Sequence, residues 1–452
     1  MKRALFALLP LAACAGPRPV IPASAAITPP ATWRTLTGAT APIATDWWRG
    51  FGDPVLADLV ARALTNNPDL AIAAARVEEV RAAARLARAQ TAPAIGGSAG
   101  TTAGQSLSPF GTPSDAIGAQ PAVQVSYDLD LFGRLRQANR AAAAQAVAGE
   151  AARETVRLAV VTSVATGYVT LRGLDQRLAI ARDTLVARTE ALRIARRRFE
   201  TGYSARLDLR QAEADYRATE VLIPQAELAI RRQEDALALL LGENPAPIAR
   251  GLTLDRIVTP VVPAGLPADL LRRRPDIYQA EQTLVAADRS LDSARAAFLP
   301  SVALTGSAGL VLSTALANPV GLFTLGGSIL GPIFDAGRTR AQADAAAARR
   351  DQAAFAYRRT ALTAFREVED SLAGVQRTGE QVAVLSAQRD ALAGALQNAT
   401  ERYRAGYSPY LEQLDAQRGL LAVDLALVQA RTDRVAAAIT LYQAMGGGWS
   451  RR

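Results

Sequence analysis

The sequence predicts an α+β fold that is mostly helical, with long coiled-coil-like helices and four β-strands per chain. Three observations predict it: a tandem duplication, two long proline-free segments with a seven-residue apolar repeat, and short segments of alternating polarity. The chain has 452 residues, of which 50% are apolar and 21% charged. This is enough material for a sizeable core.

The composition removes the residues on which most catalytic sites depend. There is no histidine, one cysteine and one lysine, Lys2. Zinc sites, Ser-His-Asp triads and lysine Schiff bases need these residues, and we find no Gly-rich phosphate loop. The net charge of +9 comes from arginines scattered between acids, which is typical of solvated helix faces. We therefore expect no enzyme, no cofactor or metal, and no nucleic-acid partner.

The first residues predict secretion. Lys2 and Arg3 precede an apolar run, Ala4–Ala13, about half as long as a bilayer-spanning helix needs to be. We expect residues 1–13 to be a signal peptide.

The only cysteine, Cys14, follows Leu11-Ala12-Ala13. This arrangement resembles the lipobox of bacterial lipoproteins, whose cysteine receives a covalent lipid after cleavage; an ordinary cleavage site is the alternative. Ala15, where an aspartate would retain a lipoprotein at the inner membrane, favours the outer one. Residues 14–46, rich in Pro, Ala and Thr, are expected to be a lipidated N-terminus and extended tether.

The rest of the chain is duplicated. Motifs of the first half recur in the second. The offset is 207 residues for the motifs up to Pro93 and 204 residues for those from Gly133 onward. The pairs are Pro68 and Pro275, Pro93 and Pro300, Gly133 and Gly337, Gly202 and Gly406, and Leu241 and Met445. We expect two domains, residues 47–250 and 251–452, each with a helix, two strands, a long helix, a sharp turn and a shorter helix.

The first helix of each half is bounded by prolines. Asn67 and Pro68 are typical of an N-cap and first turn, so a helix is predicted from Pro68 to before Pro93. Its counterpart, Pro275 to Phe298, lacks such a cap.

The strands follow. Residues 94–107 and 301–314 are rich in Gly, Ser and Thr, and apolar residues alternate with polar ones from Val123 to Leu131; a fourth strand is expected near 322–334. Strands that cross an outer membrane must close into a barrel, because an open edge leaves backbone groups unpaired. Four strands cannot close, so a membrane-spanning form must pool strands from several chains.

No proline occurs from Arg134 to Gly202 or from Arg338 to Gly406, and each segment predicts a helix of roughly 100 Å. A seven-residue repeat runs along the first and largely recurs in the second: Val164, Leu171, Leu178, Leu185, Leu192 and Phe199, then Val368, Val375, Val382, Arg389, Leu396 and Tyr403. Such a repeat predicts a left-handed supercoil. Pro224 is expected to kink the shorter helix that follows the sharp turn in the first half.

Together, these features resemble the lipoprotein branch of the outer-membrane efflux factors, the TolC-like exit ducts. The motifs are the lipobox, Trp47-Trp48, Asp130–Arg134, Arg274–Asp276, Phe298–Ser301, both Gly-Tyr-Ser turns and Gly446–Trp449. The resemblance implies a homotrimer with a 12-stranded barrel in the outer membrane and a helical tunnel in the periplasm. It also implies a passive channel that takes substrates from a periplasmic adaptor and an inner-membrane pump.

The resemblance also assigns two groups of site residues. The helix turns are expected to be periplasmic tips that dock the adaptor, at Gly202, Tyr203, Ser204, Gly406, Tyr407 and Ser408. A periplasmic gate is expected at Asp208, Tyr403, Glu412 and Asp415. On the sequence alone the glycines could be plain C-caps, and Glu412 and Asp415 a solvated first-turn pair. Ser408 replaces an arginine of the best-known pattern.

Two other classes remain open on sequence alone. A lipid-anchored periplasmic adaptor would have one helical hairpin rather than a duplicated one. A structural coiled-coil lipoprotein would have no use for alternating strands.

Overall fold

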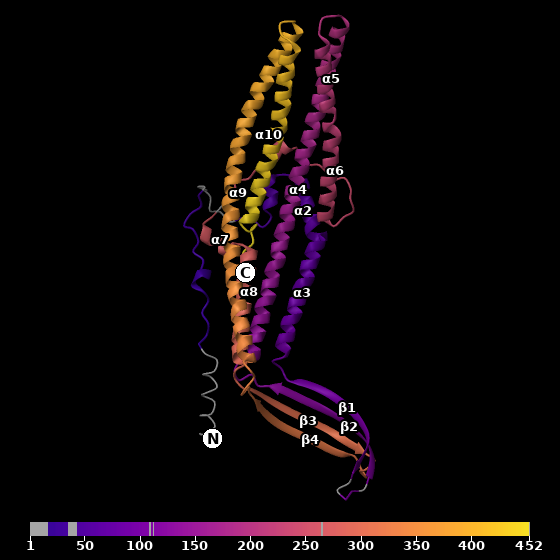
Figure 1. Cartoon of the computed structure of the whole chain (residues 1–452), viewed down its shortest axis with the longest axis vertical. Helices are drawn as coiled ribbons and strands as arrows, with labels where there is room; N and C mark the ends of the chain where they lie inside the picture. The colour runs from indigo at the N-terminus through magenta and orange to yellow at the C-terminus, as the bar shows by residue number, and fades with distance from the viewer. Residues whose placement is uncertain (1–16, 35–42, 108–109, 112, 264, 452) are drawn as a thin grey trace. The chain divides into compact units, whose positions relative to one another are not determined.

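The computed structural model describes residues 17–34, 43–107, 110–111, 113–263 and 265–451 (Figure 1). The elements are η1 (Ala23–Ala25), η2 (Trp47–Phe51), α2 (Pro54–Asn66), α3 (Pro68–Ala89), β1 (Ala94–Leu107), β2 (Pro113–Asp128), α4 (Arg134–Glu200), α5 (Arg206–Glu220), α6 (Leu222–Leu241), η3 (Leu254–Arg256), α7 (Pro267–Arg273), α8 (Pro275–Ala296), β3 (Ser301–Ser313), β4 (Val320–Leu330), α9 (Arg338–Arg404) and α10 (Tyr410–Ala444). Cys14 and the predicted signal peptide lie outside the described residues. None of the described helices is both long and apolar enough to cross a membrane.

The chain forms two compact units, and each takes segments from both halves of the sequence. The strand unit comprises residues up to Ile27, Ala75–Ala151 and Tyr278–Thr360, and the turn unit comprises Thr28–Ala74, Ala152–Ile277 and Ala361–Arg452. The long helices α4 and α9 contribute to both units.

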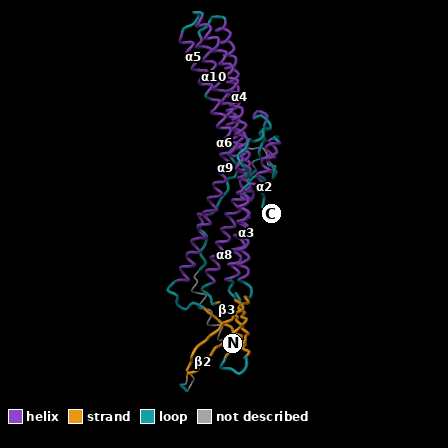
Figure 2. Tube along the Cα trace, turned by 90° about the vertical axis from the view of Figure 1, so that its right-hand side faces the viewer, coloured by secondary structure: helices purple, strands orange, loops and turns teal. Residues whose placement is uncertain are grey.

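The strand unit contains one antiparallel sheet in the order β1-β2-β3-β4 (Figure 1). Figure 2 shows its strands in orange. The β2–β3 pair joins the two halves of the sequence. At this pair a Cβ on Gly309 would lie 2.5 Å from the carbonyl oxygen of Pro121, so only glycine allows the strands to approach. The four predicted strands are confirmed, and within the described residues β1 and β4 each pair on one side only.

The second strand of each hairpin, β2 or β4, ends earlier than the sequence predicts, because an aspartate after the hairpin caps the following long helix. β2 stops before Leu131, where the backbone turns at Asp130 with a φ of 43°. The Asp130 carboxylate accepts the N–H of Leu135 at 2.9 Å. Asp335 likewise accepts the N–H of Thr339 at 2.9 Å. These carboxylates satisfy first-turn donors and lie at the positive end of the helix dipole.

The predicted N-cap of α3 is confirmed. Asn67 Oδ1 accepts the N–H groups of Asp69 and Leu70 at 2.9 and 3.1 Å. The residue before α8 has another role. Arg274 is buried and donates to the carbonyl of Ala444, at the end of α10, at 2.9 Å.

Arg274 also forms ion pairs at 2.7 Å with Asp276 and Glu367. Close packing continues beside it: Gly446 has a φ of 89°, and a Cβ there would lie 2.0 Å from the backbone oxygen of the residue before Arg274. The Arg-Pro-Asp motif and the glycine run therefore hold the end of α10 against the start of α8.

The two long helices are confirmed, with 67 residues each. Every apolar or aromatic position of the seven-residue repeat is buried or half-buried in the single chain. The exception in the repeat, Arg389, is exposed and pairs with Asp424 of α10 at 3.2 Å. The shorter helix after the first turn is broken at Val221, three residues before Pro224, into α5 and α6. Its counterpart α10 is continuous over 35 residues. The predicted kink is therefore confirmed.

Candidate functional site

Each long helix ends in a tight turn that a glycine closes. Gly202 and Gly406 have φ values of 75° and 82°. The N–H groups of Tyr203 and Tyr407 donate to the carbonyls five residues earlier, at 2.8 and 2.9 Å. This is the bonding of a Schellman motif, which needs a left-handed residue. Both glycines therefore have the left-handed backbone of a helix C-cap, the alternative that the sequence left open for them.

The two turns place their side chains alike. Tyr203 and Tyr407 are 86% and 81% exposed. The hydroxyls of Ser204 and Ser408 point inward, and neither has a hydrogen-bond partner within the described residues. Each turn therefore presents an aromatic ring to solvent.

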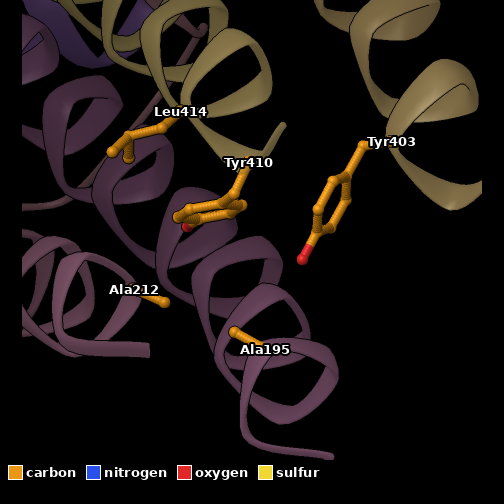
Figure 3. Close-up of a cluster of buried hydrophobic side chains, with 5 residues drawn as sticks. All are labelled: Ala195, Ala212, Tyr403, Tyr410 and Leu414. Atoms are coloured by element: carbon orange, nitrogen blue, oxygen red, sulfur yellow. The ribbon is translucent and has the colours of Figure 1, made fainter. Parts of the chain in front are cut away.

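Below the turns, a small apolar cluster joins the four helices. It consists of Ala195 of α4, Ala212 of α5, Tyr403 of α9, and Tyr410 and Leu414 of α10, all buried. Figure 3 shows the two tyrosines pointing from their helix ends toward the helices that carry the alanines. The rings lie 5.5 Å apart at a tilt of 55°. The small alanines allow the aromatic rings to fill the space between helices.

Arg198 of α4 ties the end of α9 to this cluster. Its guanidinium carbon lies 4.2 Å from the centroid of the Tyr403 ring, a cation–π contact. Its Nη2 donates to the carbonyls of Tyr403 and Arg404 at 3.1 and 3.2 Å. A cation at a helix C-terminus satisfies free carbonyls and complements the dipole.

A buried charge network lies beside the cluster. Asp215 of α5 has a side chain only 7% exposed; Arg188 Nε of α4 lies 2.8 Å from its Oδ2, and Arg418 Nε of α10 donates to its Oδ1 at 2.9 Å. The first contact is poorly aligned for a hydrogen bond, so it is mainly electrostatic. Arg188 is 3% exposed. Burial lowers the pKa of Arg188, and the charge of Asp215 opposes that shift.

The four predicted gate residues do not meet within one chain. The Tyr403 hydroxyl is buried without a partner, and among the described residues no hydrogen bond joins it to Asp208, which is half-buried in the first turn of α5. Glu412 and Asp415 are exposed at the start of α10. Glu412 Oε2 lies 3.6 Å from Arg402 Nη1. In the single chain, Tyr403 is a packing residue and the acids lie nearer the surface.

Sequence reasoning missed the charge network and Arg198. One signal was available. Arg188 lies three residues after Leu185 and four before Leu192, on the apolar face of the repeat. A charge on a buried face needs a partner, but nothing in the sequence identifies Asp215 as that partner. The described residues contain no group of three or more acids or cysteines able to hold a metal ion.

The sequence model of the outer membrane efflux protein family matches residues 59–243 and 266–447. The toluene efflux pump outer membrane protein TtgC of Pseudomonas putida is 36% identical over 415 residues, which cover 89% of this chain and 85% of that protein. The pyoverdine export outer membrane protein OpmQ of Pseudomonas aeruginosa is 33% identical, over 98% of this chain and 96% of the relative.

Solved channel structures have the same fold. The outer-membrane channel OprN aligns with a TM-score of 0.88 at 29% identity, covering 96% of this chain and 99% of that one. The open state of the MtrE outer membrane channel of Neisseria gonorrhoeae aligns with a TM-score of 0.83 at 30% identity, over 96% and 99% of the two chains.

Proposed function

Because the chain belongs to the outer membrane efflux protein family and is an outer-membrane channel component of an efflux pump, we propose that three copies assemble into one exit duct. Channels of this family are trimers that act in tripartite pumps, and they are not enzymes. The observation that carries the proposal is the four-stranded sheet, whose two edges are unpaired among the described residues. Three such sheets supply twelve strands, and their closure pairs every edge.

The partners are a periplasmic adaptor and an inner-membrane pump. The exposed rings of Tyr203 and Tyr407 support the two turns as the surface that the adaptor contacts. Replacing both by alanine should weaken cross-linking to the adaptor while leaving trimers intact; full cross-linking would contradict this assignment. The relatives are named for cargoes as different as toluene and pyoverdine.

The periplasmic entrance lies at the turns, and Asp208, Tyr403, Glu412 and Asp415 form its gate. The hydroxyl of Tyr403 is buried and has no partner among the described residues, which supports this, because such a group normally has one. In the trimer, Asp208 of a neighbouring copy provides it. Three copies of Glu412 and Asp415 around one axis bring six carboxylates together. Such a ring attracts cations and resists dehydration.

Bilayer recordings of two double variants test the gate. Tyr403→Phe with Asp208→Ala should raise single-channel conductance, and Glu412→Ala with Asp415→Ala should weaken cation selectivity and block by multivalent cations. Glu227→Ala, which removes an exposed acid of α6, is the control for a loss of charge outside the gate. Unchanged conductance in the first variant and unchanged selectivity in the second would remove the gate from the proposal.

The duct is also anchored by a lipid on Cys14 and lies in the outer membrane with its helices in the periplasm. The position of the single cysteine after Leu11-Ala12-Ala13 supports the lipid. Cys14→Ser should abolish acylation. Mass spectrometry of the wild-type protein that finds an unmodified Cys14 would contradict the anchor but not the channel.

A further inference from the structure

The N-terminal segment 17–27, which we call the strap, packs against the rest of the strand unit. It is extended apart from one turn, η1, and lies along α9 in Figure 1. Ala25, in that turn, is only 6% exposed, whereas Ala23 of the same turn is exposed. This part of the predicted tether, residues 17–27, is therefore extended apart from η1 and partly packed.

The strap supplies acceptors for a buried charge. Arg350 of α9 has a side chain that is 0% exposed. Its Nη1 donates to the carbonyl of Pro19 at 2.5 Å, and its Nη2 donates to the carbonyl of Val20 at 3.1 Å and to Asp351 Oδ1 at 2.6 Å. A buried guanidinium is costly unless its donors are satisfied. Removing the strap would leave Asp351 as the remaining described partner of Arg350.

The strap also binds the other helix that borders the β3–β4 hairpin. Arg18 pairs with Asp288 at 2.8 Å and with Asp292 at 3.0 Å, both on α8. The carbonyl of Pro17 accepts from Arg295 Nη1, in the last turn of α8, at 3.2 Å. One short segment therefore contacts both the helix that precedes the hairpin and the helix that follows it.

We propose that the strap docks between α8 and α9 as a clasp that links the two helices. Arg350 is the buried residue that holds it there, beside Arg358 of α9, which donates to the carbonyl of Ser24. The recognition is of two kinds. Arg350 binds backbone carbonyls, so the identity of the strap residues at that point matters little. Arg18 is the side chain that fixes the register of the strap on α8, because two carboxylates one helical turn apart receive it.

The clasp also limits where the N-terminus can reach. Arg295 lies six residues before the start of β3 at Ser301. Cys14 precedes Pro17 by three residues, so their α-carbons can be no more than about 11 Å apart. This consequence rests on the proposed lipid: a lipid on Cys14 would be held near the base of β3, where the proposed barrel begins. The clasp itself does not depend on it.

Thiol labelling of purified protein tests the clasp. Ala25→Cys should react with a water-soluble maleimide at least about tenfold more slowly than Ala23→Cys, because only the first side chain is covered while the strap is docked. Adding Arg350→Met to Ala25→Cys should bring its rate to within about threefold of that of Ala23→Cys. Arg349→Met, a change of the exposed neighbour, is the matched control and should leave protection intact. Equal rates for the two cysteines, or full protection in the Arg350→Met variant, would overturn the proposal.

If Arg350→Met does not assemble, a second variant, Arg18→Ala, tests whether the strap is docked. Arg18 is 46% exposed and lies outside the long helices, so Arg18→Ala should still fold. It should raise the labelling rate of Ala25→Cys at least about threefold, because the strap loses its register on α8; an unchanged rate would contradict the clasp. Labelling of Cys14 in the protein without added cysteines separates the two proposals. Reaction there would contradict the lipid while leaving the strap comparison valid.

Discussion

Asp215→Asn is expected to loosen the packing of α5 against α4, within one hairpin, and of α10 against α5. The carboxylate is 7% exposed and lies 2.8 Å from the guanidinium of Arg188, which is 3% exposed. Removing one partner of such a pair costs about 3–5 kcal/mol, because the other charge stays buried. Asparagine keeps one acceptor, so we expect about 3 kcal/mol, which is roughly a 100-fold change in an opening equilibrium.

Native-state hydrogen exchange measures this opening directly. Amides of α5 and of the first turns of α10 should exchange roughly 100-fold faster in the variant, while amides of the strand unit should keep their wild-type rates. Glu213→Gln is the matched control, because Glu213 forms a surface pair with Arg210 on the same helix. This substitution should change the free energy of opening by no more than about 0.5 kcal/mol.

The loss of stability in the Asp215→Asn variant should not depend on pH near neutrality. Burial lowers the pKa of Arg188, and the loss of Asp215 removes the charge that opposes this shift. A lowered folded-state pKa relieves the cost only when the pH rises above it, and guanidinium groups stay protonated well above neutrality. Equal exchange in the variant and the control, or a deficit that disappears between pH 6 and 8, would refute the reasoning.

Three further predictions concern the turn unit. Gly446→Ala should cost more than about 4 kcal/mol or prevent folding, because its Cβ would lie 2.0 Å from a backbone oxygen; Gly406→Ala, with a φ of 82° and nothing within 4 Å, should cost only about 1–2 kcal/mol. Thermal unfolding compares the two. Arg274→Met should lower stability by about 2–3 kcal/mol, because the end of α10 and two acids lose a buried donor; denaturant unfolding with an unchanged midpoint would contradict this. Burial raises the pKa of Tyr410 to about 12 from its ordinary 10.0. The unfolded chain ionises first, so stability should fall between pH 10 and 12, and Tyr410→Phe should flatten that loss.

The fold was largely predictable because its signals are local or periodic. Several features depend only on neighbours in the chain: the Asn67 cap, the proline at the first position of α3 and of α8, the proline-free long helices and the break before Pro224. The duplication adds a second, independent copy of each pattern. Strand limits were less accurate, since the alternation continues to Leu131 although Asp130 already caps α4.

The contacts between distant segments were not predictable from the sequence. Asp215 and Arg418 are separated by 203 residues, close to the repeat offset of 204, but a similar position in the two copies does not indicate which residues form an ion pair. The strap gave no signal either, because Arg350 binds backbone carbonyls, which every sequence offers. The resemblance to a family identified Tyr403, but its packing against Tyr410 and its contact with Arg198 appear only in the folded chain.

Cysteine cross-linking between the two edge strands tests the central claim, closure of the sheet by three chains, most directly. Within one chain β1 and β4 are three strand spacings apart, about 14 Å, beyond the roughly 7 Å that a disulfide allows between α-carbons. Ala99→Cys in β1, combined with a cysteine at each β4 position in turn, can therefore form disulfides only between chains. Amine cross-linkers would not serve, because the only lysine, Lys2, lies in the predicted signal peptide. At the β4 positions that lie opposite Ala99 of a neighbouring chain, oxidation should give cross-linked species of two and three chains and none larger. Species of no more than two chains, species of more than three, or the absence of cross-links along all of β4 would contradict the trimeric duct.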